Sequence, residues 1–358
     1  MKIIVIGAVA AGTSAAAKAR RCSEDAQITI YEQGQHISYS GCGMPYAIGG
    51  EVADINSLTP RDPAFFRSKY NVDIKTGHQV LAIDPKSKTV RIRETANGHE
   101  FTDSYDRLIM ATGARAFIPP LREELSPQQN VHVLRSIDDM LRIQAWLKQH
   151  KPASALIIGS GFIGLEMAEN LTRRGLKVSL VEQLDQVAPM LDADMACYVQ
   201  KQLEAKGVSV QTGRTLTSLP DDGSADMVLI AAGVRPNTEL ASAAGLELGK
   251  TGAIKVDVQM RTSDPDIFAC GDCAEQFHAI TGQPVYFPLG STANKTGRIA
   301  GANACLQGEP TAAHSASFSF RGVLGTGIFR VFDMTVAHTG LNERQALEAG
   351  YSVAVCHN

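Results

Sequence analysis

The sequence has no apolar run long enough to span a bilayer. Its first residues, Met1–Ile6, enter a strand-like segment directly, so we expect no secretory leader. Its seven cysteines are scattered and odd in number, which is not the pattern of a disulfide framework. The net charge of -3 gives no reason to expect nucleic acid or an acidic membrane as a partner. We therefore expect a cytoplasmic protein in reducing surroundings, where any reactive cysteine serves chemistry.

The composition is that of a globular enzyme, with 44% hydrophobic and 20% charged residues. At 358 residues the chain is too long for one ordinary core, so we expect two or three domains. We expect no metal site.

Short apolar strands alternate with helices, and the same strand–helix–strand series occurs twice. The expected elements are Ile3–Ile6, Gly12–Arg21 and Ile28–Tyr31, then Ala155–Ile158, Gly164–Arg174 and Val178–Val181. Such alternation is typical of parallel sheets covered by helices, so the sequence predicts an α/β fold with a duplicated dinucleotide-binding unit.

Other segments depart from this pattern. Residues 73–108 are rich in turns and β-branched residues and predict antiparallel strands. Pro119–Asn130 has the character of a crossover between domains. Phe318–Val336 alternates like exposed strands, which indicates a further domain.

The second unit carries the full G-x-G-x-x-G fingerprint between a strand and a helix, at Gly159, Gly161 and Gly164, with Phe162 and Ile163 inside it. The first glycine permits the tight turn, the second admits the pyrophosphate, and the third allows close packing of helix on strand. Glu182 ends the next strand, where an acid accepts hydrogen bonds from the ribose 2′-hydroxyl. Because the residues that follow Glu182 include no lysine or arginine to meet a 2′-phosphate, we expect NADH to be preferred over NADPH.

The first unit keeps only the outer glycines of the fingerprint. The segment is Gly7, Ala8, Val9, Ala10, Ala11 and Gly12, and by itself it fits a plain tight turn as well as a phosphate-binding loop. Glu32 at the end of the next strand favours dinucleotide binding, as does the later strand Asp266–Asp272 that ends in Gly-Asp.

Taken together, these motifs resemble the pyridine nucleotide–disulfide oxidoreductases. The resemblance covers essentially the whole chain and also includes the segments Ala111-Thr112-Gly113, Ala232–Asn237 with its Gly233, and Gly271-Asp272, all in the family's order. It implies FAD in the first unit, with Asp272 on the ribityl chain, and a nicotinamide dinucleotide in the second. It also implies a fold class of two Rossmann-like domains (three-layer ββα) plus the start of an α+β interface domain.

The domain division expected on this basis has an FAD-binding domain in two parts. Its parts are residues 1–118 and 247–316, with an NAD-binding domain at 119–246 and an incomplete C-terminal interface domain at 317–358. Since that domain forms the dimer contact in the family, we expect a homodimer where it is complete.

Cys42 is the candidate catalytic residue. It lies in the turn Ser38–Tyr46 between two glycines, and Pro45 suits the first turn of a helix. A cysteine at a helix N-terminus is stabilised as the thiolate, so we expect a depressed pKa and a nucleophile near neutral pH. One cysteine here, in place of a Cys-x4-Cys pair, resembles the single-cysteine branch: coenzyme A-disulfide reductases, persulfide reductases, NADH oxidases and NADH peroxidases.

Within that branch, Ala10 distinguishes the groups. Oxidases and peroxidases typically have a histidine there, whereas the opening Gly-Ala-Val-Ala is similar to the coenzyme A-disulfide reductases. Gly41 departs from that group, which usually has Asn beside the cysteine.

The first helix supplies candidate coenzyme A contacts. Ser14, Lys18 and Arg21 share one helix face, so the two cations could meet phosphates, although an ordinary solvated basic face is the alternative. The resemblance adds contacts at Ser38, Lys69 and Asn294.

The resemblance also implies further cofactor contacts. Val80 corresponds to a position whose backbone contacts adenine, and Phe162 to the aromatic that covers the nicotinamide pocket. The segment Pro288–Asn294, which includes Leu289 and Ala293, is expected to precede a helix whose N-terminal N–H groups would stabilise negative charge on the flavin.

The expected activity passes hydride from NADH through FAD to Cys42 and on to a low-molecular-weight disulfide or persulfide, such as coenzyme A disulfide. The alternatives are an NADH oxidase that acts on O₂, a reductase of a small electron-transfer protein, and a redox-sensing flavoprotein. Cys270 and Cys273 form a C-x-x-C spacing, but we expect a packing role for them rather than a second redox pair.

Overall fold

The structure is a computed structural model that describes residues 1–120, 130–218, 225–306 and 318–357. The crossover expected between Pro119 and Asn130 therefore lies largely outside the described residues. The chain divides into two compact units. The first unit consists of residues 1–39, 59–115 and 236–323, and the second of residues 40–58, 116–235 and 324–358.

The first unit is built on a five-stranded parallel sheet in the order β15-β7-β1-β2-β3. Its strands are β1 (Lys2–Ile6), β2 (Gln27–Tyr31), β3 (Asp73–Lys75), β7 (Arg107–Met110) and β15 (Ile267–Ala269). An antiparallel sheet lies in the same unit, formed by β4 (His78–Asp84), β5 (Thr89–Glu94) and β6 (Glu100–Ser104). The antiparallel strands predicted for residues 73–108 are thus confirmed at β4–β6, whereas β3 and β7 join the parallel sheet.

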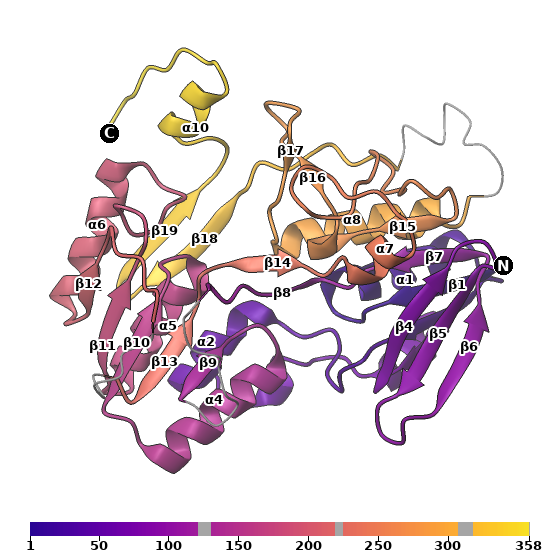
Figure 1. Cartoon of the computed structure of the whole chain (residues 1–358), viewed down its shortest axis with the longest axis horizontal. Coiled ribbons are helices and arrows are strands. Elements are labelled where there is room, and N and C mark those ends of the chain that lie inside the picture. The colour runs from indigo at the N-terminus through magenta and orange to yellow at the C-terminus, as the bar shows by residue number, and fades with distance from the viewer. Residues whose placement is uncertain (121–129, 219–224, 307–317, 358) are drawn as a thin grey trace. The chain divides into compact units, whose positions relative to one another are not determined.

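The residues of β1 alternate between two cores. Ile3 and Val5 pack with alanines of the helices α1 (Ala10–Cys22) and α8 (Gly290–Asn303). Ile4 and Ile6 pack with valines and isoleucines of β4 and β5. Because successive side chains of a strand point to opposite faces, this alternation fixes helices on one face of the parallel sheet and the antiparallel sheet on the other. Figure 1 shows α1 and α8 along one face, which confirms the three-layer ββα arrangement in this unit.

Glycines of α8 bring it unusually close to α1. A Cβ at Gly297 would lie 2.3 Å from the carbonyl oxygen of Ala11, and one at Gly301 would lie 2.1 Å from that of Ala15. The remaining elements of the first unit are α3 (Pro63–Tyr70), α7 (Glu239–Ala243), the 3₁₀ turn η3 (Gly271–Cys273), β16 (Gln276–Phe277) and β17 (Pro284–Val285).

The second unit repeats the parallel sheet, in the order β12-β11-β10-β13-β9. The strands are β9 (Val131–Val133), β10 (Ser154–Ile158), β11 (Lys177–Val181), β12 (Ser209–Gln211) and β13 (Met227–Ile230). Its helices are α2 (Met44–Gly49), α4 (Ile137–His150), α5 (Phe162–Arg173), α6 (Ala193–Ala205) and α10 (Glu343–Glu348), with 3₁₀ turns η1 (Gly41–Gly43) and η2 (Ile55–Ser57). The duplicated strand–helix–strand series predicted from the sequence is confirmed, with bounds that differ by one or two residues.

Two pairs of short strands complete the described fold. β18 (Gly327–Val331) and β19 (Met334–His338) form an antiparallel hairpin in the second unit, as the alternation of Phe318–Val336 predicts in part. β8 (Ala114–Ala116) pairs with β14 (Val234–Pro236). The domain division expected from the sequence stays a prediction. None of the helices in the described part of the chain is both long and apolar enough to cross a membrane.

Candidate functional site

The first fingerprint folds into a tight loop between β1 and α1. Gly7 has a φ of +102°, and a Cβ there would lie 2.2 Å from the carbonyl oxygen of Ala111. A Cβ at Gly12 would lie 1.8 Å from the carbonyl oxygen of Gly7. Both outer glycines are therefore required by the backbone itself, while Val9 occupies the position before α1 and needs no such freedom.

Glu32 follows β2 and faces this loop. Its carboxylate accepts a hydrogen bond from the N–H of Ala8 at 2.8 Å and one from the N–H of Gly34 at 2.8 Å. The first turn of α1 holds no acidic side chain. A loop with N–H groups at a helix N-terminus, an acid at the end of the next strand and glycines in place of side chains fits a bound dinucleotide.

The distant segments implied by the resemblance meet at the same loop. A Cβ at Gly271 would lie 2.6 Å from the Cβ of Ala11 and 3.6 Å from that of Ala293, and the N–H of Gly271 donates to Thr296 Oγ1 at 3.0 Å. Asp272 lies in η3 and is half-buried. The structure thus places the Gly-Asp element and the start of α8 against the first turn of α1.

The other residues expected to contact the flavin lie in several different elements of the first unit. Pro288 and Leu289 directly precede α8, but the helix begins at Gly290, so the expectation that the whole segment to Asn294 precedes the helix is wrong. Val80 lies in β4 with its side chain buried in the core. β4 begins beside Glu32, whose carbonyl oxygen accepts from the N–H of His78 at 2.9 Å. Thr112 and Gly113 follow β7, and Thr112 Oγ1 donates to the carbonyl oxygen of Asn237 at 2.7 Å.

The second fingerprint repeats this geometry. A Cβ at Gly159 would lie 2.5 Å from the carbonyl oxygen of Ala231, and one at Gly164 would lie 2.0 Å from that of Gly159. A Cβ at Gly161 would meet no heavy atom within 4 Å, so this glycine leaves open space where a pyrophosphate could approach. Ile163 lies in the first turn of α5, and Gly233, with a φ of +108°, follows β13.

Glu182 occupies the same place as Glu32 in the duplicate. Its carboxylate accepts from the N–H and the hydroxyl of Ser160, at 2.9 and 2.7 Å, and from the N–H of Leu184 at 3.0 Å. The expectation that no arginine lies nearby needs a correction, because the N–H of Arg214 donates to the carbonyl oxygen of Glu182 at 3.0 Å. Arg214 comes from the segment after β12, so a reading of the residues that follow Glu182 could not find it.

Phe162 opens α5 and packs against the β18–β19 hairpin. Its ring stacks on His338, with centroids 5.8 Å apart and planes at 17°, and meets Phe329 edge-on at 5.1 Å. A Cβ at Gly327 would lie 2.7 Å from the Phe162 ring, so this glycine makes room for the aromatic.

Cys42 lies in η1, directly before α2, and is exposed. The turn is held closely, since a Cβ at Gly43 would lie 2.3 Å from Leu58 Cδ2. Gly41 and Pro45, the latter in the first turn of α2, confirm the local geometry expected around the cysteine.

The sequence led us to expect a lowered pKa for Cys42. The protein's own groups raise that pKa instead, so the expectation is wrong as far as these groups are concerned. Desolvation raises the pKa of Cys42 above its ordinary value, and the nearby carboxyl of Glu166 raises it further. The backbone hydrogen bond of Cys42 and the charge of Arg135 act in the opposite direction but are the smaller causes. α2 has only six residues, and its dipole end is too short to dominate these effects.

A carboxylate–arginine network lies beside the Cys42 segment in the second unit. Tyr46 of α2 donates a hydrogen bond to Glu166 Oε1 of α5 at 3.3 Å. One turn further along α5, Glu169 accepts from Arg330 Nε of β18 at 3.0 Å. The sequence reading missed these residues, although two acids three positions apart among the apolar residues of Phe162–Ala168 and Leu171 could have marked buried carboxyls.

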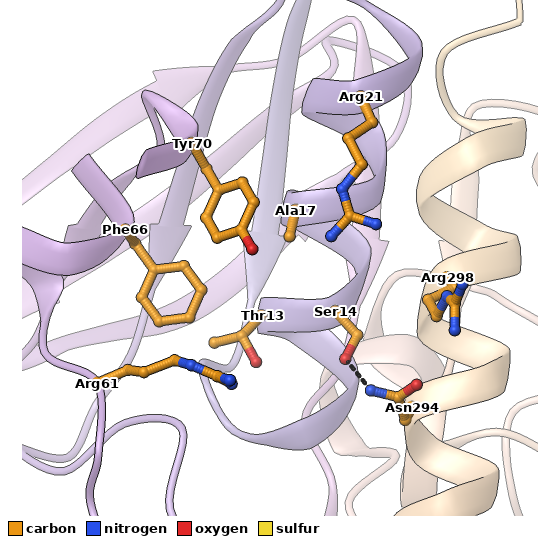
Figure 2. A pocket seen from close by; sticks show the side chains of 9 residues that line it. All are labelled: Thr13, Ser14, Ala17, Arg21, Arg61, Phe66, Tyr70, Asn294 and Arg298. Carbon is orange, nitrogen blue, oxygen red and sulfur yellow. Dashed lines mark hydrogen bonds between the residues drawn. The ribbon is translucent and has the colours of Figure 1, made fainter. Parts of the chain in front are cut away.

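Three of the candidate coenzyme A contacts, Ser14, Arg21 and Asn294, line a cavity of about 260 Å³ in the first unit (Figure 2). Ser14 and Asn294 lie on facing sides of α1 and α8 and share a hydrogen bond of 2.8 Å, and Arg21 lies about two turns further along α1. The cavity is lined by Thr13, Ser14, Ala17, Arg21, Arg61, Phe66, Tyr70, Asn294 and Arg298, so it holds three arginines and no acid.

The remaining predicted contacts do not line this cavity. The ammonium group of Lys18 lies over the Phe318 ring, 5.0 Å from its centroid, and that of Lys69 lies over Phe65 at 5.5 Å. Ser38 lies in the loop after β2, where its N–H donates to the carbonyl oxygen of Ala8 at 2.9 Å. Arg61 and Arg298 were missed, because nothing in their sequence context sets them apart from solvated surface charges.

Cys270 and Cys273 are fully buried in the first unit, and Cys273 Sγ donates to backbone carbonyl oxygens of Met110 and Cys270. Burial raises the pKa of both thiols. This surrounding fits the expected packing role, since a buried thiol with a raised pKa is inert.

Comparison with known proteins agrees with this geometry. The family model described as pyridine nucleotide-disulphide oxidoreductase matches residues 1–316. A protein named NADH oxidase from Methanocaldococcus jannaschii is 36% identical over 95% of this chain and 76% of its own length. A coenzyme A disulfide reductase from Staphylococcus haemolyticus is 30% identical over 98% of this chain and 79% of its own length.

Among solved structures, an NAD-dependent persulfide reductase from A. fulgidus has a TM-score of 0.89 and 41% identity, over 98% of this chain and 66% of its own. The chain thus spans about three quarters of the two curated relatives and about two thirds of this structure. FAD and NAD(P)H are the cofactors of this group, and the glycine loops, Glu32 and Glu182 are in the positions that such cofactors require. The chain belongs to the pyridine nucleotide-disulphide oxidoreductase family.

Proposed function

We propose that this protein reduces a low-molecular-weight disulfide or persulfide, such as coenzyme A disulfide, with electrons from NADH, and that Cys42 is the group that attacks the substrate. The observation that carries the proposal is the placement of Cys42. This exposed residue lies in a glycine-flanked turn that leads into α2, within the unit that holds the second fingerprint.

The proposed roles follow from the residues of each unit. The loop Gly7–Gly12, with Glu32 and Asp272, would hold FAD, and the loop Gly159–Gly164, with Glu182, would hold NADH. When bound, FAD accepts a hydride from NADH and makes an electron pair available for the reduction of sulfur. Phe162, at the first position of α5, would cover the nicotinamide.

Cys42 performs the sulfur chemistry. Its thiolate attacks one sulfur of the substrate, the substrate S–S bond breaks, and a mixed disulfide forms while the other half leaves as a thiolate. An electron pair then releases the second half and restores the Cys42 thiolate. The whole reaction consumes one NADH and one proton for each disulfide and produces two thiols.

The arginine-lined cavity supports coenzyme A as the carrier of the sulfur. Arg21, Arg61 and Arg298 could form charge-assisted hydrogen bonds with phosphate oxygens, and Tyr70 and Phe66 offer aromatic faces. The coenzyme A disulfide reductase among the relatives acts on such a substrate according to its name.

One variant, assayed with sulfur substrates and with an artificial dye, tests the proposal. Cys42→Ser should abolish NADH-dependent reduction of coenzyme A disulfide and polysulfide while NADH-dependent reduction of an artificial dye continues. Reduction of the disulfide at the wild-type rate by Cys42→Ser would refute the role of Cys42.

A second candidate function is an NADH oxidase that acts on O₂, which the name of the Methanocaldococcus relative favours. Ala10, in place of the histidine typical of oxidases, argues against it. Parallel assays with O₂, coenzyme A disulfide and polysulfide separate the two. An electron-transfer reductase or a redox sensor would show no turnover of disulfide even in the wild type, and an electron-transfer reductase would still reduce its protein acceptor in Cys42→Ser. The homodimer and the cytoplasmic location expected from the sequence are part of the proposal as well.

A further inference from the structure

We propose that Tyr286 and Thr296 are positioning residues for FAD, because their hydroxyl groups hold in place the turn that carries Asp272. This inference rests on the proposed function, which places FAD against the loop Gly7–Gly12 and against Asp272. Both hydroxyl groups act through the turn and not through a contact with the sulfur substrate.

The turn η3 lies directly against the first turn of α1, next to the glycine loop. Gly271 has a φ of +73°, and a Cβ there would lie 2.6 Å from the Cβ of Ala11. The N–H of Cys270, the residue before the turn, donates to the carbonyl oxygen of Met110 at 2.9 Å. A binding site works only when its groups are held within about 0.5 Å of the productive geometry, so the position of this turn matters for a cofactor that spans both elements.

Thr296 of α8 holds the first residue of the turn. Its Oγ1 accepts a hydrogen bond from the N–H of Gly271 at 3.0 Å and donates to the carbonyl oxygen of Thr292, one helical turn back, at 2.8 Å. The side chain of Thr296 is fully buried. A buried backbone N–H needs a partner, because without one it retains the full cost of its desolvation. The hydroxyl of Thr296 therefore links the helix that packs on α1 to the start of the turn.

Tyr286 lies shortly before α8 and holds the second residue of the turn. Its hydroxyl donates to the carbonyl oxygen of Asp272 at 3.0 Å. The side chain of Tyr286 is half-buried, in contrast to that of Thr296. The two hydroxyls thus bond successive residues of the turn, one through a carbonyl oxygen and the other through an N–H.

A buried glutamine ties the Tyr286 segment to the same turn. The Nε2 of Gln276 donates to the carbonyl oxygen of Ala274, directly after the turn, at 2.8 Å. Its Oε1 accepts from the N–H of Phe287, the residue next to Tyr286, at 2.8 Å. The amide of Gln276 therefore fixes the segment from which the Tyr286 hydroxyl reaches Asp272.

These bonds prepare the turn for the cofactor. Side chains of Gln276, Tyr286 and Thr296 hold the backbone between Gly271 and Ala274, so little of this backbone has to be ordered when FAD binds. When a site is in its binding arrangement in only a fraction of the molecules, the apparent dissociation constant rises by the inverse of that fraction. Loss of either hydroxyl should therefore weaken FAD binding through the turn alone.

The test measures FAD binding to the full chain without any sulfur substrate. Holoprotein is dialysed to equilibrium against a series of FAD concentrations, and the FAD bound per chain gives the dissociation constant. Tyr286→Phe should raise this constant roughly fivefold, which corresponds to the loss of one ordinary hydrogen bond. Thr296→Val keeps the shape of the side chain and should raise it at least as much, because the N–H of Gly271 loses its partner.

A second set of variants separates positioning from a loss of packing. Thr296→Ser keeps the hydroxyl and loses only the methyl group, so the dissociation constant should return nearly to the wild-type value. Tyr105→Phe and Thr172→Val are matched controls, because each removes a buried hydroxyl that has no hydrogen-bond partner in the described part of the chain. Both controls should leave the dissociation constant of FAD unchanged.

The inference is overturned if Tyr286→Phe binds FAD as tightly as the wild type, or if the matched controls weaken binding equally. Equal weakening in Thr296→Ser and Thr296→Val would also overturn it, since the hydroxyl would then have no role. If Thr296→Val does not fold, Tyr286→Phe still decides, because it removes a hydroxyl and keeps the ring. A failure of the proposed function would appear separately, as disulfide reduction that survives Cys42→Ser.

Discussion

The carboxylate of Glu182 accepts hydrogen bonds from both the N–H and the hydroxyl of Ser160, so the acid at the end of β11 is fixed against the first turn of the fingerprint. Glu32 is fixed in the same way by the N–H of Ala8 in the other unit. Both acids keep lone pairs for ribose hydroxyls, since a carboxylate can accept about four hydrogen bonds. The duplicated sequence thus yields two copies of one binding geometry.

This geometry predicts a preference for NADH. A fixed Glu182 carboxylate would repel a 2′-phosphate, which costs on the order of 1–3 kcal/mol, so kcat/KM should be at least about tenfold higher with NADH than with NADPH. Steady-state kinetics with both nucleotides check this, and equal efficiencies would contradict it.

Arg214 offers a control on that preference. Its backbone N–H is bonded to the carbonyl oxygen of Glu182, and its exposed guanidinium donates to Gln211 Oε1 at the end of β12, so it is a cation near this acid that a 2′-phosphate could use. Arg214→Ala should lower the residual rate with NADPH severalfold and leave the rate with NADH unchanged. A loss of activity with both nucleotides would indicate a structural role for Arg214 instead.

The glycine loops predict two opposite results of the same substitution. In Gly12→Ala the new methyl group would collide with the Gly7 carbonyl, so we expect loss of bound FAD and a destabilisation of about 1–3 kcal/mol. In Gly161→Ala the methyl group would enter open space, so the melting temperature should stay constant while KM for NADH rises. Thermal melts and flavin content separate the two, and a normal FAD content in Gly12→Ala would show that the loop yields.

The arginine-lined cavity predicts a selective effect on substrate. Arg21→Ala and Arg298→Ala should each raise KM for coenzyme A disulfide roughly tenfold, because a charge-assisted hydrogen bond is worth about 1.5–3 kcal/mol. A disulfide without phosphate groups should be reduced as before. Lys295→Ala, on α8 but outside the cavity lining, is the matched control, and equal effects on both disulfides would argue against phosphate recognition.

Sequence alone predicted the features that are determined by the backbone conformation of a short segment, such as the glycine loops. The spacing of Gly159, Gly161 and Gly164 between a strand and a helix predicts one particular tight loop, and the structure contains this loop. Arg298 and Arg61 could not be predicted, because their significance comes from the packing of α8 and of the residues before α3 around one cavity. For the protein groups by themselves, the direction of the Cys42 pKa shift was predicted wrongly for a related reason: the short helix was visible in the sequence, but the desolvation of the cysteine and the buried Glu166, 124 positions away, were not.

Glu166 predicts how the free energy of unfolding depends on pH. Its pKa is about 7 in the folded protein against an ordinary value of 4.5, so the folded state binds more protons than the unfolded state between these values. The free energy of unfolding should therefore fall as pH rises from about 5 to about 8, by up to roughly 3 kcal/mol from this group. Below pH 4.5 the carboxyl is protonated in both states and contributes no slope.

Glu166→Gln cannot ionise and should lose this slope. Relative to the wild type, the variant should gain stability steadily from pH 5 to pH 8, whatever the packing of the amide costs at a single pH, because only the titration changes with pH. Urea unfolding at several pH values measures the difference, and Glu204→Gln, an exposed substitution on α6, should run parallel to the wild type. Parallel curves for Glu166→Gln would mean that Glu166 is already ionised at pH 5 in the folded protein, and the burial of an unpaired carboxyl beside Tyr46 would then require another explanation.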